Sequence, residues 1–380
     1  MNFHIFHHDD ADGYASAAVL MRYYLPNIDA LGEDTVTTYS CNYNYPMDLS
    51  DVEPGDAVFI LDYSLSTAGD KENIVNLYNH TTEDIYWIDH HASSSDAISH
   101  SEEKESEEEI CIRKTLKKIA KNGLIYTVNE YAGCMLTYIW CFTRETPVVG
   151  KQLIDANEET KSVALSLIHY IAESAPTWIK LVSDHDTFKH TIPNSAEFCL
   201  AVTHHGLNDT FINPDLVNFS NLDNPDEQEV ERYTWDGLLL MSYQNNQNAK
   251  LLQRNGFVCD LEIGHSDDDQ SIPSYTIACL NGYGNSFVFG DYYNEVDAVV
   301  IFNFDGINWR YSMFSKADGY CCKEFAELMY SEYKLNGGGH DHAAGWSAPL
   351  NIFDKNSPEC NRYKISNIRK ILEYDKEKYA

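Results

Sequence analysis

The chain has 380 residues, with 27 basic and 59 acidic side chains, so its formal net charge at pH 7 is −32. Because binding to long nucleic acid depends on the neutralisation of many phosphates, no long duplex partner is expected for so acidic a chain. No apolar run approaches the length that crosses a bilayer, so no membrane partner is expected either.

The length of the chain allows two hydrophobic cores rather than one. Its ten cysteines are scattered, with one adjacent pair, Cys321-Cys322, and no C-x-x-C pair. The first residues carry no signal-peptide pattern. In a long chain this cysteine usage indicates reduced thiols, and we expect a cytoplasmic protein.

A strand-like run at the amino terminus ends in His8-x-Asp10-x-Asp12-Gly13, and a helix-like stretch follows over 14–25. An imidazole and two carboxylates on alternate residues crowd like charges, which is unfavourable unless a cation neutralises them. Taken alone, the stretch allows two interpretations equally. One is a metal site, and the other is a helix cap at Asp12 with His8 and Asp10 as turn residues.

Two later strands end in the same kinds of side chain. The apolar run 58–61 ends at Asp62, and the run 84–88 continues into Asp89-His90-His91. A helix is predicted between them, over 67–79. Because the carboxyl ends of parallel strands share one edge, these clusters predict a parallel α/β sheet with a ligand site beyond that edge. This coincidence favours the metal site over caps and turns.

The remainder of the first half is predicted to be mostly helical. A glutamate-rich polar loop over 93–109 precedes expected helices over 112–120, 129–143 and 158–182. The last helix ends in Ser183-Asp184-His185-Asp186, a fourth cluster at the end of an apolar element. We predict Asp184 as a metal ligand with Asp186 nearby, although either carboxylate could be structural.

The second half of the chain differs from the first in composition and in its pattern of predicted elements. Residues 208–229 are rich in Asn, Asp and Pro, which is typical of a connection, and a helix is expected over about 229–255. Short strands and one helix (322–334) follow. We predict a catalytic domain (1–207), a linker with connecting helix (208–255), a smaller α/β domain (256–350) and a C-terminal tail or helix (351–380).

A glycine-rich motif, Gly337-Gly338-Gly339-His340, lies near the end of the smaller domain and is followed by Ala343-Ala344-Gly345. Successive glycines let backbone N–H groups converge on an anion, and His340 can add a donor. Such turns are common, but the preceding helix and the following Ala-Ala-Gly make this one more specific.

In this order, the motifs resemble the DHH phosphoesterase family, over residues 8 to 345. The resemblance implies a parallel-sheet domain with helices on both faces, a smaller C-terminal α/β domain and a cleft between them. Because the pyrophosphatases of the wider superfamily lack the glycine–His motif, the resemblance is to the nano-RNase or oligoribonuclease-like branch, which acts on short oligonucleotides and small nucleotides.

The resemblance also implies two metal ions. One would be bound by His8, Asp10 and Asp62, and the other by Asp12, Asp62, His90 and Asp184. Carboxylates and imidazoles without thiolates favour Mn²⁺, or else Mg²⁺, over a structural zinc. Two such cations can activate water for attack on phosphorus.

The remaining roles follow from the same resemblance. His91 would contact the scissile phosphate or the leaving oxygen, and Asp89 would orient the neighbouring histidine. The terminal phosphate or 3′ side of the substrate would be bound by His340 and the glycines Gly337, Gly338 and Gly339.

One position departs from the family pattern. Phe314 stands where many relatives have an arginine that binds substrate phosphate. Arg310 or Lys316 is the candidate to compensate, and Phe314 could stack on a base, but we prefer a core position for this side chain.

The leading hypothesis is a metal-dependent exonuclease that degrades very short RNA to 5′-mononucleotides. An alternative is a phosphodiesterase or phosphatase for cyclic or linear dinucleotides or for 3′-phosphoadenosine 5′-phosphate. A third, from another class, is a catalytically inactive nucleotide-binding regulator, which the completely filled ligand positions disfavour. The oligomeric state, a homodimer included, is left open.

Overall fold

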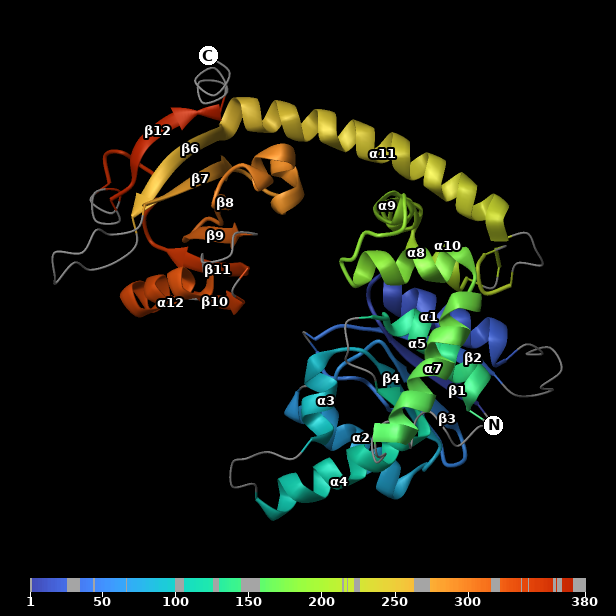
Figure 1. Cartoon of the computed structure of the whole chain (residues 1–380). Helices are drawn as coiled ribbons and strands as arrows, with labels where there is room; N and C mark the ends of the chain where they lie inside the picture. The colour runs from blue at the N-terminus through green and yellow to red at the C-terminus, as the bar shows by residue number, and fades with distance from the viewer. Residues whose placement is uncertain are drawn as a thin grey trace. The chain divides into compact units, whose positions relative to one another are not determined.

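The computed structural model describes residues 2–371 except 26–34, 44, 66, 100–105, 126–129, 145–157, 214, 217, 222–225, 263–273, 316–321, 336, 341, 358–359 and 361–363. The chain forms two compact units, residues 1–241 and 242–380 (Figure 1). Each unit has its own sheet and its own core.

The described part of the first unit is built on a five-stranded parallel sheet in the order β2-β1-β3-β4-β5. The strands are β1 (Phe3–His8), β2 (Val36–Cys41), β3 (Ala57–Leu61), β4 (Ile85–Asp89) and β5 (Leu124–Ile125). All five residues of β3 are buried, as expected for a central strand that is covered on both faces.

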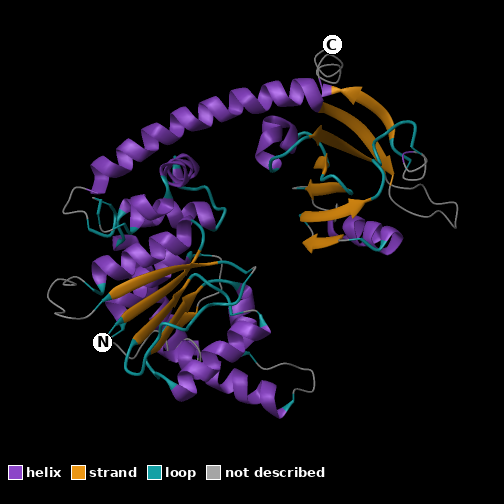
Figure 2. Ribbon diagram, turned by 180° about the vertical axis from the view of Figure 1, so that it is seen from behind, coloured by secondary structure: helices purple, strands orange, loops and turns teal. Residues whose placement is uncertain are grey.

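Helices cover both faces of this sheet (Figure 2). Phe59 and Leu61 of β3 belong to one buried core, and Val58 and Ile60 belong to another. The first core also contains residues of α1 (Ala11–Tyr23), α5 (Gly133–Thr143), α7 (Glu158–Ser174), α8 (Thr177–Asp186) and α9 (Ser195–His205). The second contains residues of α2 (Ala68–His80) and α4 (Glu107–Asn122). Short helices α3 (Ala92–Ile98) and α10 (Leu207–Phe211) complete the described helices of this unit. The alternation of β3 side chains between two cores fixes the strand register.

Two predicted segments differ from the structure. The glutamate-rich loop contains α3 and the start of α4, because Ser106 and Glu109 form a reciprocal capping box and acidic side chains are favourable in a first helical turn. The single helix predicted over 158–182 is two helices, α7 and α8, because Pro176 cannot continue a helix.

The second unit contains a seven-stranded mixed sheet in the order β10-β11-β9-β8-β7-β6-β12, into which helix α11 (Asp226–Asn255) leads. The strands are β6 (Gly256–Glu262), β7 (Ser274–Asn281), β8 (Ala298–Phe304), β9 (Trp309–Phe314), β10 (Gly337–His340), β11 (Ala343–Ala348) and β12 (Ser366–Lys370). A 3-10 helix (Ser286–Asn294) follows β7, and α12 (Cys322–Tyr333) packs against β10 and β11. The segment predicted as a tail or helix thus contributes a strand, β12, which pairs with β6.

The structure confirms the predicted fold class, with a parallel-sheet α/β domain followed by a smaller domain that has a sheet of its own. The boundary between the two compact units falls inside α11, at Met241. None of the described helices has the length and hydropathy needed to cross a membrane.

Candidate metal centre

Three neighbouring strands of the first sheet end at the same edge and bring His8, Asp62 and Asp89 together. Asp62 follows β3 directly and has a φ of 51°, in the left-handed region that Asp and Asn tolerate better than most residues. Such a conformation is retained where the surroundings require it, and it turns the chain sharply at the end of the strand.

The start of α1 supplies two more carboxylates. Asp10 is the N-cap, because its Oδ1 accepts a hydrogen bond from Gly13 N at 2.9 Å. Its Oδ2 lies 2.7 Å from His8 Nδ1. The cap is therefore Asp10 rather than Asp12, and one carboxylate both caps the helix and belongs to the site.

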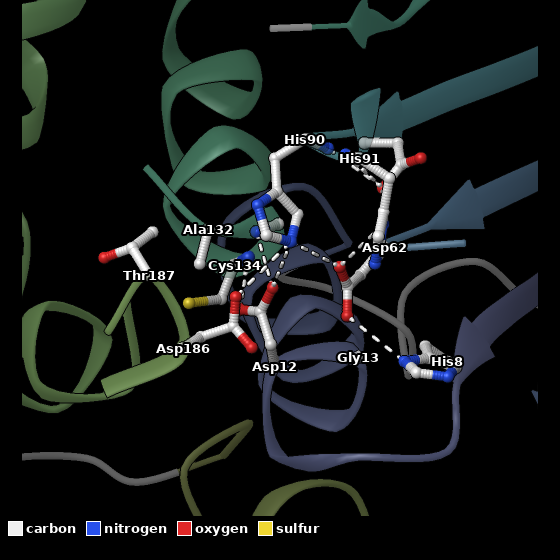
Figure 3. Close-up of polar contacts among 12 residues, drawn as sticks. His8, Asp12, Gly13, Asp62, His90, His91, Ala132, Cys134, Asp186 and Thr187 are labelled. Atoms are coloured by element: carbon white, nitrogen blue, oxygen red, sulfur yellow. Dashed lines mark hydrogen bonds and ion pairs between the residues drawn. The ribbon is translucent and has the colours of Figure 1, made fainter. Parts of the chain in front are cut away.

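The described residues contain three overlapping groups with the spacing of metal ligands. They are His8, Asp10 and Asp62; Asp12, His90 and Asp186; and Asp62, Asp89, His90 and His91. His90 Nε2 lies 3.2 Å from Asp62 Oδ1, 3.4 Å from Asp186 Oδ2 and 3.9 Å from Asp12 Oδ2 (Figure 3). Side chains that are far apart in the sequence therefore converge, as predicted.

The pKa shifts of the carboxylates in this cluster indicate repulsion that a bound cation would relieve. Burial, followed by the charges of Asp12 and Asp10, raises the pKa of Asp62 well above its ordinary value. Burial and the charge of Asp12 likewise raise the pKa of Asp186, to about 8. Within the described residues, Asp62 Oδ1 and His8 Nδ1 are buried without a hydrogen bond of suitable geometry. Oxygen and imidazole ligands in this state fit Mn²⁺ or Mg²⁺.

Asp12 is fixed by the amino terminus of α5. Its two carboxylate oxygens accept hydrogen bonds from the backbone N–H groups of Gly133, at 2.5 Å, and Cys134, at 2.9 Å. The positive end of the helix dipole adds a favourable interaction with the carboxylate. The sequence carries no local signal for this role of Gly133, because the contact spans more than a hundred residues.

Asp89 orients His91. Its Oδ1 accepts hydrogen bonds from His91 Nδ1, at 2.7 Å, and from the backbone N–H of His90, at 2.9 Å, while Ser94 Oγ donates to Oδ2. Although burial lowers the pKa of His91, the hydrogen bond and charge of Asp89 raise it to about 9. The described contacts of Asp89 identify His91 as the neighbouring histidine that it orients, and Ser94 as a partner that the motif had not indicated.

The structure gives Asp184 and Asp186 different surroundings, and Asp186 rather than Asp184 belongs to a group of possible metal ligands. Asp184 accepts hydrogen bonds from the backbone N–H groups of Thr191 and Ile192, at 2.9 and 3.1 Å, and from the Thr191 hydroxyl, at 2.6 Å. Burial opposes ionisation, but these hydrogen bonds lower the pKa of Asp184. The carboxylate that joins His90 and Asp12 is that of Asp186.

We expect Asp186→Asn to weaken metal binding and Asp184→Asn to lower the stability of the fold. Asp186→Asn should weaken Mn²⁺ binding at least about tenfold, because the site loses a charged oxygen. Asp184→Asn should leave Mn²⁺ affinity within about twofold and lower the free energy of unfolding by about 1–3 kcal/mol, because buried hydrogen bonds are lost. Calorimetric Mn²⁺ titration and urea unfolding of both variants measure the two effects, and the reverse pattern would restore Asp184 as the ligand.

In the second unit the glycine-rich motif is not a turn. Gly337 to His340 form β10, an edge strand of the described sheet that pairs antiparallel with β11, where His340 lies opposite Ala343. The backbone is therefore extended rather than wrapped around an anion, because pairing with β11 determines its conformation. The side chains of Gly339 and His340 lie outside the described part of the structure.

The structure also shows the position of Phe314, which stands where many relatives have an arginine, and of Arg310, which is a candidate to replace that arginine. Phe314 pairs with Ala343 and packs at the edge of a core cluster, as preferred from the sequence. Arg310 lies toward the other end of β11, opposite Ser347, and its Nε donates to Asp305 at 2.5 Å. Its predicted contact with phosphate therefore competes with this ion pair. Lys316 lies outside the described residues.

No protein-family model and no curated protein matches the chain. Among solved structures, a DHH domain described as belonging to a family of ribosomal proteins has a TM-score of 0.47 at 11% identity, over 91% of this chain and 82% of that one. RecJ from Thermus thermophilus in complex with Mn²⁺ has a TM-score of 0.47 at 14% identity, over 93% and 50%. The pGpG-specific phosphodiesterase PggH from Vibrio cholerae has a TM-score of 0.32 at 12% identity, over 93% and 96%.

These similarities are weak, and they carry no conclusion about the substrate of this chain. The branch of the family that acts on short oligonucleotides stays a prediction.

Proposed function

We propose that this chain is a metal-dependent phosphodiesterase that hydrolyses very short oligoribonucleotides to 5′-mononucleotides. One observation carries the proposal: Asp62 belongs to two of the three ligand groups, and His90 also belongs to two. The Asp62 carboxylate has two oxygens and would serve two adjacent cations, whereas the His90 imidazole would bind one of them through Nε2.

The residues that would hold the two cations are His8, Asp10 and Asp62 for one, and Asp12, Asp62, His90 and Asp186 for the other. When bound, such a pair would lower the pKa of bound water and would neutralise charge on the attacking and leaving oxygens. The chain contributes by fixing these ligands on strand ends and helix termini, which are the rigid parts of the fold.

His91 is the group that acts on the phosphate, and Asp89 and Ser94 position it. Asp89 holds the His91 ring through Nδ1, so the ring is positioned to donate a hydrogen bond from its other nitrogen to a phosphoryl or leaving oxygen. Ser94 donates to the second oxygen of Asp89 and prevents this carboxylate from rotating. His91 is thus the candidate catalytic group, and Asp89 and Ser94 are positioning residues.

The charge of the chain favours a small substrate. A net charge of −32 repels the extended phosphate backbone of a long polymer, whereas a di- to pentanucleotide brings few phosphates, and these can be neutralised at the metal centre itself. The strong acidity therefore supports a short substrate over the long polymer that other nucleases degrade.

The test is a substrate panel with Mn²⁺. It contains 5′-labelled di- to pentaribonucleotides, cyclic dinucleotides, 3′-phosphoadenosine 5′-phosphate and pyrophosphate. We expect the short linear RNAs to be consumed fastest, with release of 5′-mononucleotides, and pyrophosphate hardly at all. Faster turnover of a cyclic dinucleotide or of the bisphosphate would replace the substrate assignment, and preference for pyrophosphate, or no turnover of any member, would refute the proposal.

A further inference from the structure

An exposed aromatic ring lies beside the metal centre and has no role in the chemistry described so far. Tyr43 follows β2, and its ring centroid is 5.3 Å from that of His8. The side chain is 40% exposed, although it adjoins a cluster of buried carboxylates. An exposed aromatic ring beside a charged site is available to a ligand that has an apolar face.

The ring of Tyr43 is held in one orientation. It stacks on Tyr63 with a centroid distance of 4.7 Å and an angle of 17° between the planes. Its hydroxyl oxygen accepts a hydrogen bond from Ser64 N at 3.1 Å. The supporting Tyr63 is fully buried, and its hydroxyl donates to Asp70 Oδ2 at 3.2 Å. One face of the Tyr43 ring thus packs against the Tyr63 ring, while the side chain remains partly exposed.

We propose that Tyr43 is a stacking platform for a nucleobase, so that the metal centre selects nucleotides over phosphate compounds that lack a base. In a nucleotide only the ribose separates the base from its phosphate. A phosphate positioned near His8 therefore places its own base within reach of the neighbouring ring. This inference rests on the proposed function and adds the substrate class to it.

The energetics suit such a role. Stacking of a base on an aromatic side chain does not depend on the identity of the base, because every base has a π-face. A ring that is already fixed by Tyr63 and Ser64 loses little conformational freedom when the ligand binds, so most of the stacking energy is available as affinity. The platform thus predicts general nucleotide recognition without a preference for one base.

A binding experiment tests the platform without any catalytic turnover. Adenosine 5′-monophosphate and ribose 5-phosphate share the ribose and the phosphate and differ only in the base. With Mn²⁺ present, we expect wild-type protein to bind the nucleotide about tenfold more tightly than the sugar phosphate, which is within the range measured for stacking of one base. Tyr43→Ala should remove this difference by weakening nucleotide binding alone.

Two further variants serve as controls. Tyr43→Phe keeps the ring and should keep most of the preference, although Ser64 N loses its acceptor. Tyr45 lies on the same segment and is 77% exposed, so Tyr45→Ala removes a comparable side chain and should leave both affinities unchanged. Equal binding of the two ligands to wild-type protein, no binding of either, or an equal effect of Tyr43→Ala on both ligands would overturn the platform.

The failure of this inference can be told apart from failure of the proposed function. If wild-type protein hydrolyses short RNA but binds the nucleotide and the sugar phosphate equally, only the platform is wrong. If it hydrolyses no phosphodiester but prefers the nucleotide through Tyr43, the platform stands and the catalytic proposal falls.

Discussion

Asp62→Asn is expected to reduce kcat/KM for short RNA by about a thousandfold or more. The Asp62 carboxylate belongs to two ligand groups, and its loss removes the one charged group that both cations would share. Stabilisation of transition-state charge by bound metal amounts to several kcal/mol, and each 1.4 kcal/mol corresponds to about tenfold in rate. Initial rates with a labelled diribonucleotide, measured over a range of Mn²⁺ concentrations, give this number.

The same variant should remain folded. Asn tolerates the positive φ that Asp62 adopts, and it has nearly the same volume. The wild-type carboxylate is buried among other carboxylates, so a neutral amide relieves repulsion in the metal-free protein. We therefore expect an unchanged or higher free energy of unfolding without metal. Stabilisation by Mn²⁺, about 2.7 kcal/mol for wild type at a hundred times Kd, should be largely lost.

Asp96→Asn is the matched control for the change of charge. Asp96 lies on α3, close in sequence to the DHH motif, but its side chain is exposed and belongs to none of the ligand groups. Its activity and its response to Mn²⁺ should equal those of wild type. If Asp62→Asn retains more than about a tenth of wild-type activity, a shared carboxylate at position 62 is not the basis of catalysis.

The convergence of the site could be predicted because it follows from strand geometry. His8, Asp62 and His90 stand at or just after the ends of three strands, and parallel strands with helical crossovers must place those ends at one edge. The apolar pattern of each strand was sufficient to locate its end. No contact between distant side chains had to be known.

The choice between Asp184 and Asp186 could not be made in this way. Both are at the end of α8, and two residues along a helix differ by about 200° in direction, so only one of them can face β3 and β4. Which one does so depends on the following loop, where Thr191 and Ile192 bind the Asp184 carboxylate. The sequence of α8 alone does not specify that contact.

The glycine-rich motif shows a similar limit. Four residues with three glycines have little conformational preference of their own, so their structure is decided by a partner. Pairing with β11 makes them a strand. Tyr43 and Gly133 were also missed, since each acts through side chains that lie far away in the sequence.

Gly133→Ala is expected to disable the metal centre although it changes no ligand. A Cβ atom at this position would lie 2.6 Å from Asp62 Cβ and 2.9 Å from Asp12 Oδ2, which is closer than real contacts of this kind. Both aspartates are about 99% buried and cannot rotate away into solvent. We expect about a hundredfold loss of kcat/KM, because small displacements of catalytic groups have effects of this size. Overpacking should also lower the free energy of unfolding by about 1–3 kcal/mol.

Gly69→Ala provides the comparison that isolates this effect. Gly69, like Gly133, lies in the first turn of a helix of the first unit, but a Cβ there would meet only Pro46 at an ordinary 3.7 Å. Alanine in a helix loses less backbone entropy on folding than glycine, so this variant should be as active as wild type and slightly more stable. Because Gly133 N also donates to Asp12, displacement of the α5 terminus would affect ligand position and ligand charge together. Retention of wild-type Mn²⁺ affinity and activity by Gly133→Ala would mean that the two aspartates need not be held as closely as the structure places them.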